Sequence, residues 1–162
     1  MIEIIERNIL NNTSGVICHQ VNCFAMGKGL AKDIKEKYPV VYEEYIKTIT
    51  GLNDISRHSL LGGVLYVPIN SSLTIANLFG QYKYKQYNDI QSVYTDYTAL
   101  SSCLSNIKDY VLITGMDVHI PYEIGCGLGG GSWDNVYSII EKIFTRIDIN
   151  CFINRMGVNN DR

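Results

Sequence analysis

Apolar residues along the chain alternate between short β-rich runs and longer stretches with helical spacing. The short runs predict strands at 1–10, 16–23, 60–69, 73–79, 110–114, 118–124 and 147–153. Apolar positions that recur every three or four residues predict helices at 30–38, 39–49, 93–107 and 132–143. Strands that alternate with helices form βαβ units, so the pattern predicts an α/β fold with a mixed, mostly parallel sheet covered on both faces.

Polar side chains cluster at the end of the second predicted strand. His19, Gln20 and Asn22 occupy its C-terminal half, after the apolar run that begins at Val16. Open α/β sheets bind ligands at the carboxyl ends of their strands, so this is where we expect a site.

Two glycine-rich loops each join a predicted strand to a predicted helix. Residues 125–131 hold five glycines in seven positions, and Gly27 and Gly29 flank Lys28 in the other loop. Glycine lets successive amide groups approach an anion, and a helix N-terminus adds unpaired donors, so a phosphate can bind without a basic side chain. For either loop taken alone, the alternative to anion binding is that its glycines provide flexibility or allow close packing of the helix on the sheet. Together they predict a ligand with two phosphates, although neither a P-loop nor a Rossmann fingerprint is present.

Length, charge and composition indicate how many domains the chain forms and which partners it can bind. The 162 residues suit one domain, which we place at 1–156, followed by a polar tail at 157–162 that we expect to be disordered. With a net charge of −2 and no basic cluster, nucleic acid is not an expected partner. No apolar run is long enough to span a membrane and the N-terminus is acidic, so we expect a cytoplasmic protein with no membrane partner, and a monomer.

Cysteine chemistry gives little indication of a metal site. The five cysteines are odd in number and form no C-x-x-C pair, which favours buried thiols over metal ligands. We therefore expect neither a metal nor a cofactor.

Four segments, in this order and spacing, resemble the macro-domain family. They are Arg7-Asn8-Ile9-Leu10, residues 17–22 ending in Asn22, residues 27–31, and residues 124–130 with Trp133 beyond. The resemblance covers about 4–152 and is greatest to the branch typified by the yeast ADP-ribose-1″-phosphate phosphatase and its phage-encoded relatives. It implies a three-layer α/β/α sandwich that binds ADP-ribose or a phosphorylated or acylated derivative.

The resemblance also assigns residues to parts of the ligand. The first segment lies by the adenine in such domains, Asn22 and the first glycine loop by the distal ribose, and the second glycine loop by the pyrophosphate. Many macro domains have Asp where this chain has Asn8, so the acceptor for the adenine amino group is uncharged here. The ligand-binding residues predicted in this way are Asn8, Ile9, Leu10, Gln20, Met26, Gly27, Lys28, Gly29, Leu30, Ala31, Gly125, Cys126, Gly127, Leu128, Gly129 and Gly130.

The catalytic residues that the resemblance implies are His19 and Asn22. His19 matches the catalytic histidine of the phosphatase branch, and an imidazole that titrates near neutrality suits a general base or a phosphohistidine nucleophile. The positions that match the Lys and Asp of the ADP-ribosyl-glutamate hydrolases are Asn77 and Gly129, which argues against that mechanism.

Three functions stay open. The first is hydrolysis of ADP-ribose-1″-phosphate, the second is non-catalytic binding or sequestration of ADP-ribose or an NAD-derived signalling nucleotide, and the third is hydrolysis of ADP-ribosyl or O-acyl-ADP-ribose adducts. The tyrosine-rich segment 82–97 is either a cover for the ligand or a surface loop that leads into a helix.

Overall fold

A central six-stranded sheet organises the molecule. The computed structural model describes residues 1–156, and the predicted disordered tail at 157–162 lies outside the described residues. The strands are β1 (Ile2–Glu6), β2 (Gly15–Val21), β3 (Val64–Pro68), β4 (Leu73–Phe79), β5 (Val118–Pro121) and β6 (Cys151–Arg155). Their order across the sheet is β1-β6-β5-β2-β4-β3, and every neighbouring pair is parallel except β3 with β4.

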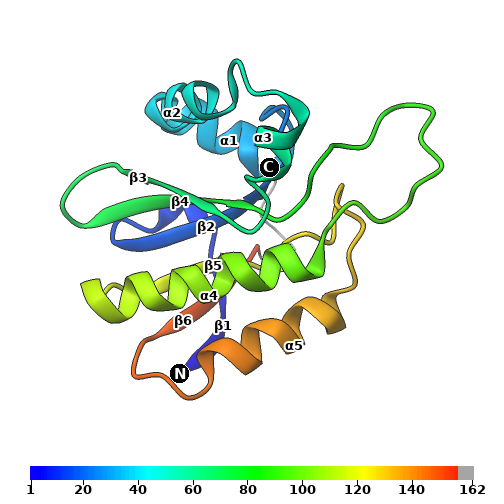
Figure 1. Cartoon of the computed structure of the whole chain (residues 1–162). Coiled ribbons are helices and arrows are strands. Elements are labelled where there is room, and N and C mark those ends of the chain that lie inside the picture. The colour runs from blue at the N-terminus through cyan, green and yellow to red at the C-terminus, as the bar shows by residue number, and fades with distance from the viewer. Residues whose placement is uncertain (157–162) are drawn as a thin grey trace.

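Helices cover both faces of this sheet (Figure 1). One face carries α1 (Gly29–Lys37), α2 (Pro39–Ile49) and the short α3 (Asp54–His58), and the other carries α4 (Tyr97–Thr114) and α5 (Trp133–Phe144). Each face has its own apolar core: Ile34, Val41 and Tyr45 pack on one side, and Leu104, Ile107 and Ile140 on the other. The predicted three-layer α/β/α sandwich with a mixed, mostly parallel sheet is confirmed.

Helix α4 differs from the sequence prediction at its C-terminal end. The run 110–114 was predicted to be a strand because of its β-branched and apolar residues, and this prediction is wrong. Val111 is fully buried and follows Ile107 by four residues, so it extends the apolar stripe of the helix by one more turn. Gly115, with φ of 72°, ends the helix in the left-handed conformation that favours glycine.

Several boundaries also move. The first predicted strand, 1–10, is β1 followed by a 3-10 turn, η1 (Ile9–Asn11), and the strand predicted at 147–153 is β6, which begins at Cys151. The predicted strand 60–69 shortens to β3, and α3 was not predicted at all. By contrast, the prediction of 73–79 coincides with β4.

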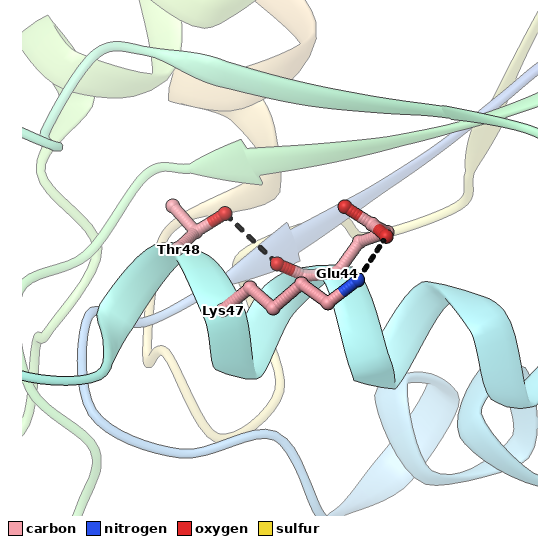
Figure 2. Close-up of polar contacts among 3 residues, drawn as sticks. All are labelled: Glu44, Lys47 and Thr48. Atoms are coloured by element: carbon pink, nitrogen blue, oxygen red, sulfur yellow. Dashed lines mark hydrogen bonds and ion pairs between the residues drawn. The ribbon is translucent and has the colours of Figure 1, made fainter.

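Three polar residues of α2, Glu44, Lys47 and Thr48, contact one another along the helix (Figure 2). Lys47 Nζ lies 3.1 Å from Glu44 Oε1, and the Thr48 hydroxyl donates to the Glu44 carbonyl at 2.9 Å. An exposed ion pair of this kind contributes only about 0.3–0.5 kcal/mol. Burial of Tyr45 and Ile49 therefore contributes more than this ion pair to holding α2 in place. Within residues 1–156, no helix combines the length and apolarity needed to cross a bilayer.

The N-terminus of α4 provides a test of this fold. Asp96 accepts a hydrogen bond from the Ala99 amide at 2.9 Å, whereas Ser132, the matching residue of α5, makes no side-chain capping bond. We expect Asp96→Ala to lower the free energy of unfolding by about 1 kcal/mol and Ser132→Ala to lower it by much less. Urea denaturation of the two variants measures this, and equal losses would contradict the difference in capping.

Candidate functional site

Five parallel strands end at one edge of the sheet, and the loops that leave this edge form the candidate site. These loops are 7–8 after β1, 22–28 after β2, 80–96 after β4 and 122–132 after β5. Figure 1 shows segment 80–96 extending away from the body of the molecule, beside the loop that precedes α5. The register of β2 with β4, from Gly15 opposite Leu73 to Val21 opposite Phe79, brings their carboxyl ends level. Both glycine loops therefore lie at the edge predicted from the sequence.

The first glycine loop is held by its protein neighbours. Asn22 Oδ1 accepts from the amides of Phe24 and Ala25, both at 2.8 Å, and the Tyr45 hydroxyl donates to the Asn22 carbonyl at 2.7 Å. Arg57 donates to the Cys23 carbonyl at 2.8 Å. The predicted catalytic residue Asn22 thus shapes the loop through its amide oxygen.

Beyond this turn the first loop is open. Met26 is buried, whereas residues 27–29 are exposed, and Leu30 and Ala31 are partly buried in the first turn of α1. Gly29 has φ of 59°, which requires glycine for an unstrained turn into the helix. The open stretch therefore presents backbone, together with the Lys28 side chain, at the start of a helix.

The second glycine loop begins with a sharp change of direction. Glu123 has φ of 60°, an uncommon value for a residue with a side chain, and it turns the chain out of β5. The Gly131 amide then donates to the Gly125 carbonyl at 2.8 Å, which closes the loop on itself. Between these ends, the amides of Gly127, Leu128 and Gly129 make no hydrogen bond to any residue of 1–156. Three successive donors are therefore unpaired, and two of them belong to exposed residues, Gly127 and Leu128.

The helices that follow the two loops both lack a side-chain hydrogen bond at the N-cap. Neither Lys28 at the N-cap of α1 nor Ser132 at the N-cap of α5 makes a side-chain capping bond. Asn53 and Asp96 do cap α3 and α4 through their side chains. Because an uncapped first turn leaves amide donors unpaired, α1 and α5 both offer donors at the candidate site.

Gly27 and Gly127 have no internal reason to be glycine. Within residues 1–156 they are the only glycines with neither a positive φ nor a neighbouring atom that a Cβ would meet within 4 Å. In contrast, a Cβ on Gly130 would overlap the Ser92 carbonyl oxygen, and one on Gly129 would lie 2.5 Å from Thr95 Oγ1. One glycine in each loop thus keeps open a space that protein packing does not use.

The predicted adenine segment follows β1. Asn8 is half-buried and caps η1, since its Oδ1 accepts from the Leu10 amide at 3.0 Å. Ile9 and Leu10 are buried against the core on the α1 side of the sheet. Of the three residues predicted to contact the ligand here, Asn8 is therefore the most exposed, and Arg7, which precedes it, is exposed as well.

The second loop's remaining side chains are Cys126 and Leu128. Leu128 is 58% exposed, and Cys126 is partly buried with its thiol 3.4 Å from the Ile124 carbonyl. Burial raises the pKa of Cys126 to about 11, so the thiolate is scarce at neutral pH. All five cysteines are free thiols, and among residues 1–156 no three histidine, cysteine or acidic side chains lie together as metal ligands would.

His19 lies in the core, away from solvent. Its side chain is 1% exposed, and Nε2 lies 2.5 Å from Asn77 Oδ1. Asn77 donates its own amide hydrogen to the Leu65 carbonyl, so its oxygen accepts and His19 Nε2 carries the proton. The other ring nitrogen, Nδ1, is an acceptor with no partner among the described residues. Burial lowers the pKa of His19 to about 4, well below the neutral value expected from its sequence context.

Sequence reasoning missed Gln81 and Thr95, the residues that join the loops. Gln20 Nε2 donates to Gln81 Oε1 at 2.8 Å and to Thr95 Oγ1 at 2.9 Å. The amide nitrogen of Gln20, a residue predicted to contact ligand, is thus bonded to protein groups, whereas its Oε1 is buried without a partner among the described residues. Thr95 and Gln81 stand in a polar segment without periodicity, and no sequence signal indicated that they approach β2.

The titration of His19 predicts a pH-dependent stability. The unfolded chain binds a proton below about pH 6.5 and the folded chain only below about pH 4, so stability falls as the pH drops between these values. The whole shift corresponds to about 3 kcal/mol. We expect His19→Gln to lose this part of the pH dependence, while contributions from other groups, including His119, stay in both proteins. Urea denaturation from pH 7 to 4.5 measures the difference, and parallel curves would place His19 in solvent.

Known structures share this fold over nearly the whole chain. A protein of unknown function from Bacteroides thetaiotaomicron is 27% identical, with a TM-score of 0.82 over 96% of this chain and 98% of that one. A macrodomain protein from Streptomyces coelicolor is 23% identical, with a TM-score of 0.75 over 97% and 100%. DarTG of Thermosipho africanus in complex with ADP-ribose is 19% identical, with a TM-score of 0.72 over 99% of this chain and 43% of that one.

Neither a family model nor a curated protein matches the chain. The fold is therefore established through structure: five parallel strands and one antiparallel strand between two helical layers, in the arrangement of known macrodomains. The chain has the macrodomain fold.

Proposed function

We propose that this protein binds ADP-ribose or a close derivative at the edge where the two glycine loops meet the sheet. The observation that carries the proposal is the pair Gly27 and Gly127, one in each loop, which neither backbone conformation nor packing requires to be glycine. A ligand that approaches both loops closely accounts for both positions.

The chemistry of the site suits a diphosphate. The amides of Gly127, Leu128 and Gly129 are unpaired within residues 1–156, and the uncapped first turns of α1 and α5 add further donors. Backbone donors at a helix N-terminus bind phosphate oxygens without a basic side chain. Lys28 is exposed in the first loop and adds one positive charge.

The structural comparisons support the nature of the ligand. The DarTG structure that shares this fold holds ADP-ribose. At 19% identity that likeness alone concerns the fold, so the proposal depends on the loops of this chain. Asn8, half-buried after β1, is the residue that we assign to the adenine, which it would meet through its amide group.

Hydrolysis of ADP-ribose-1″-phosphate is a second candidate function, in the branch typified by the yeast phosphatase and its phage-encoded relatives. The observation that favours it is the state of His19, whose Nδ1 is unprotonated and unpartnered among the described residues. An uncharged imidazole at neutral pH suits a general base or a nucleophile. Since His19 is only 1% exposed, the reaction requires the protein around it to open so that substrate can reach Nδ1.

The chain offers little support for the glycohydrolase mechanism that uses Lys and Asp. Asn77, at the Lys position, is fully buried and bonded to His19 and Leu65. Gly129, at the Asp position, has no side chain, and its carbonyl accepts from the amides of Tyr94 and Thr95. We therefore do not propose that mechanism.

Alanine at the two open glycines tests the binding proposal. Gly27→Ala and Gly127→Ala have room for the new methyl group, so we expect their melting temperatures to match that of the unchanged protein. Their affinity for ADP-ribose should fall by about tenfold or more, since the methyl group enters the space assigned to the ligand. Isothermal titration calorimetry measures this loss.

Gly130→Ala is the matched control for these variants. Its φ of 69° and its contact with Ser92 predict a lower melting temperature as well as weaker binding. Unchanged affinity in both Gly27→Ala and Gly127→Ala would contradict the proposed site.

Phosphorus NMR tests the phosphatase candidate. Release of inorganic phosphate from ADP-ribose-1″-phosphate should be lost in His19→Gln and His19→Ala while ADP-ribose binding persists. His58→Ala, which removes an exposed histidine, is the control and should keep full turnover. Shifted ligand resonances without release would leave binding as the only function.

A further inference from the structure

The Gln20 side chain is enclosed by three glycines from two different segments. A Cβ on Gly80 would overlap Gln20 Oε1, one on Gly125 would lie 3.1 Å from the same oxygen, and one on Gly129 would lie 3.2 Å from Nε2. Gly80 follows β4, whereas Gly125 and Gly129 belong to the second glycine loop. The Gln20 amide therefore fills the space between the second loop and the segment that begins at Gly80.

Hydrogen bonds join these elements through Thr95. Gln20 Nε2 donates to Thr95 Oγ1 at 2.9 Å, and the Thr95 hydroxyl donates to the Gly125 carbonyl at 2.7 Å. Gln20 also donates to Gln81 Oε1 at 2.8 Å, and Gln81 and Thr95 form an antiparallel bridge. Thr95 is 6% exposed and Gln81 9% exposed, so water does not compete strongly for these bonds.

The far end of the loop is held by the same segment. The amides of Tyr94 and Thr95 both donate to the Gly129 carbonyl, at 2.7 and 3.0 Å. The loop is thus fixed through carbonyl oxygens at Gly125 and at Gly129. The three amides at 127–129, which the proposed function assigns to the pyrophosphate, lie between or at these fixed points.

We infer that Gln20 and Thr95 are positioning residues, which hold the second glycine loop in the shape that presents its amides to the pyrophosphate. They do so without contacting the ligand themselves. This inference rests on the proposed function. It adds that the affinity for the diphosphate depends on segment 80–96, because Tyr94 and Thr95 bond to the loop and Gln81 at the other end of the segment bonds to Gln20.

The variants that test this remove hydrogen bonds while keeping volume. Thr95→Val removes the hydroxyl, Gln20→Met removes the amide, and Thr95→Ser restores the hydroxyl. We expect Thr95→Val and Gln20→Met each to weaken ADP-ribose binding by about fivefold to tenfold, and Thr95→Ser to bind within about twofold of the unchanged protein. The double variant should lose little more than either single one, because both act through one network.

Adenosine, which lacks both phosphates, separates positioning from general damage. Its affinity should change by about twofold or less in all variants, measured by calorimetry or NMR titration. The exposed change Thr98→Val, in α4, is the matched control for Thr95→Val and should leave both affinities unchanged. Equal weakening of adenosine and ADP-ribose, or full ADP-ribose affinity in Thr95→Val and Gln20→Met, would overturn the inference.

Hydrogen exchange of the unliganded protein gives an independent result. The amides of Tyr94 and Thr95 should exchange faster in Thr95→Val and Gln20→Met than in Thr95→Ser, and the amide resonances of 127–129 should shift. If the unchanged protein fails to bind ADP-ribose, the proposed function fails, and this exchange measurement still decides whether Gln20 and Thr95 hold the loop. Exchange rates equal to those of the unchanged protein would overturn that role.

Discussion

The parallel pairing of β2 with its two neighbours is the constraint on which the rest of the structure depends. β2 lies between β4 and β5, and its residues from Gly15 to His19 are buried. Burial on both faces specifies the register strongly, because a slip of one residue would exchange the side chains that face the two cores. The same register brings the ends of β2 and β4 level, so that both glycine loops and segment 80–96 leave the sheet at one edge.

Successive side chains of β2 point to opposite faces of the sheet, so its polar residues lie in different surroundings. Val16 and Cys18 face the core under α4 and α5, and Gln20 continues that face toward the second glycine loop. Ile17 and Val21 face the opposite core, and His19 lies on their side, bonded to Asn77. Two neighbouring residues of one polar motif therefore act in different places. Gln20 supports the second loop, whereas His19 stays uncharged inside the α1 side of the molecule.

Periodicity in the sequence was sufficient for most of the fold and for the common position of the two glycine loops. The pattern of β4 and the glycines before α1 and α5 led to one sheet edge for both loops, because parallel strands must end together. It was insufficient at 110–114, where β-branched residues favour a strand locally but Val111 continues the buried stripe of α4. The signals for the longer helix were the spacing from Ile107 and the glycine at 115.

The contacts around Thr95 could not be predicted, for a different reason. Side-chain hydrogen bonds between segments far apart in the sequence depend on the final three-dimensional path of a loop, and segment 80–96 has no periodic pattern from which to infer one. A glycine-rich run in the sequence also does not show what each glycine contacts. Only the structure distinguishes Gly127, which is open, from Gly129 and Gly130, which are packed against segment 80–96.

This distinction changes how the second loop is understood. If all five of its glycines were needed by a ligand, the unliganded loop would have few internal restraints. The conformational entropy lost when the loop becomes ordered would then weaken binding. Here Gly129, Gly130 and Gly131 allow the loop to pack tightly against segment 80–96 and against itself. Most of the ordering is therefore complete before a ligand arrives. The glycines of this loop therefore have two roles. Several of them fix the shape of the loop, and Gly127 keeps open the space in which a phosphate can approach the backbone.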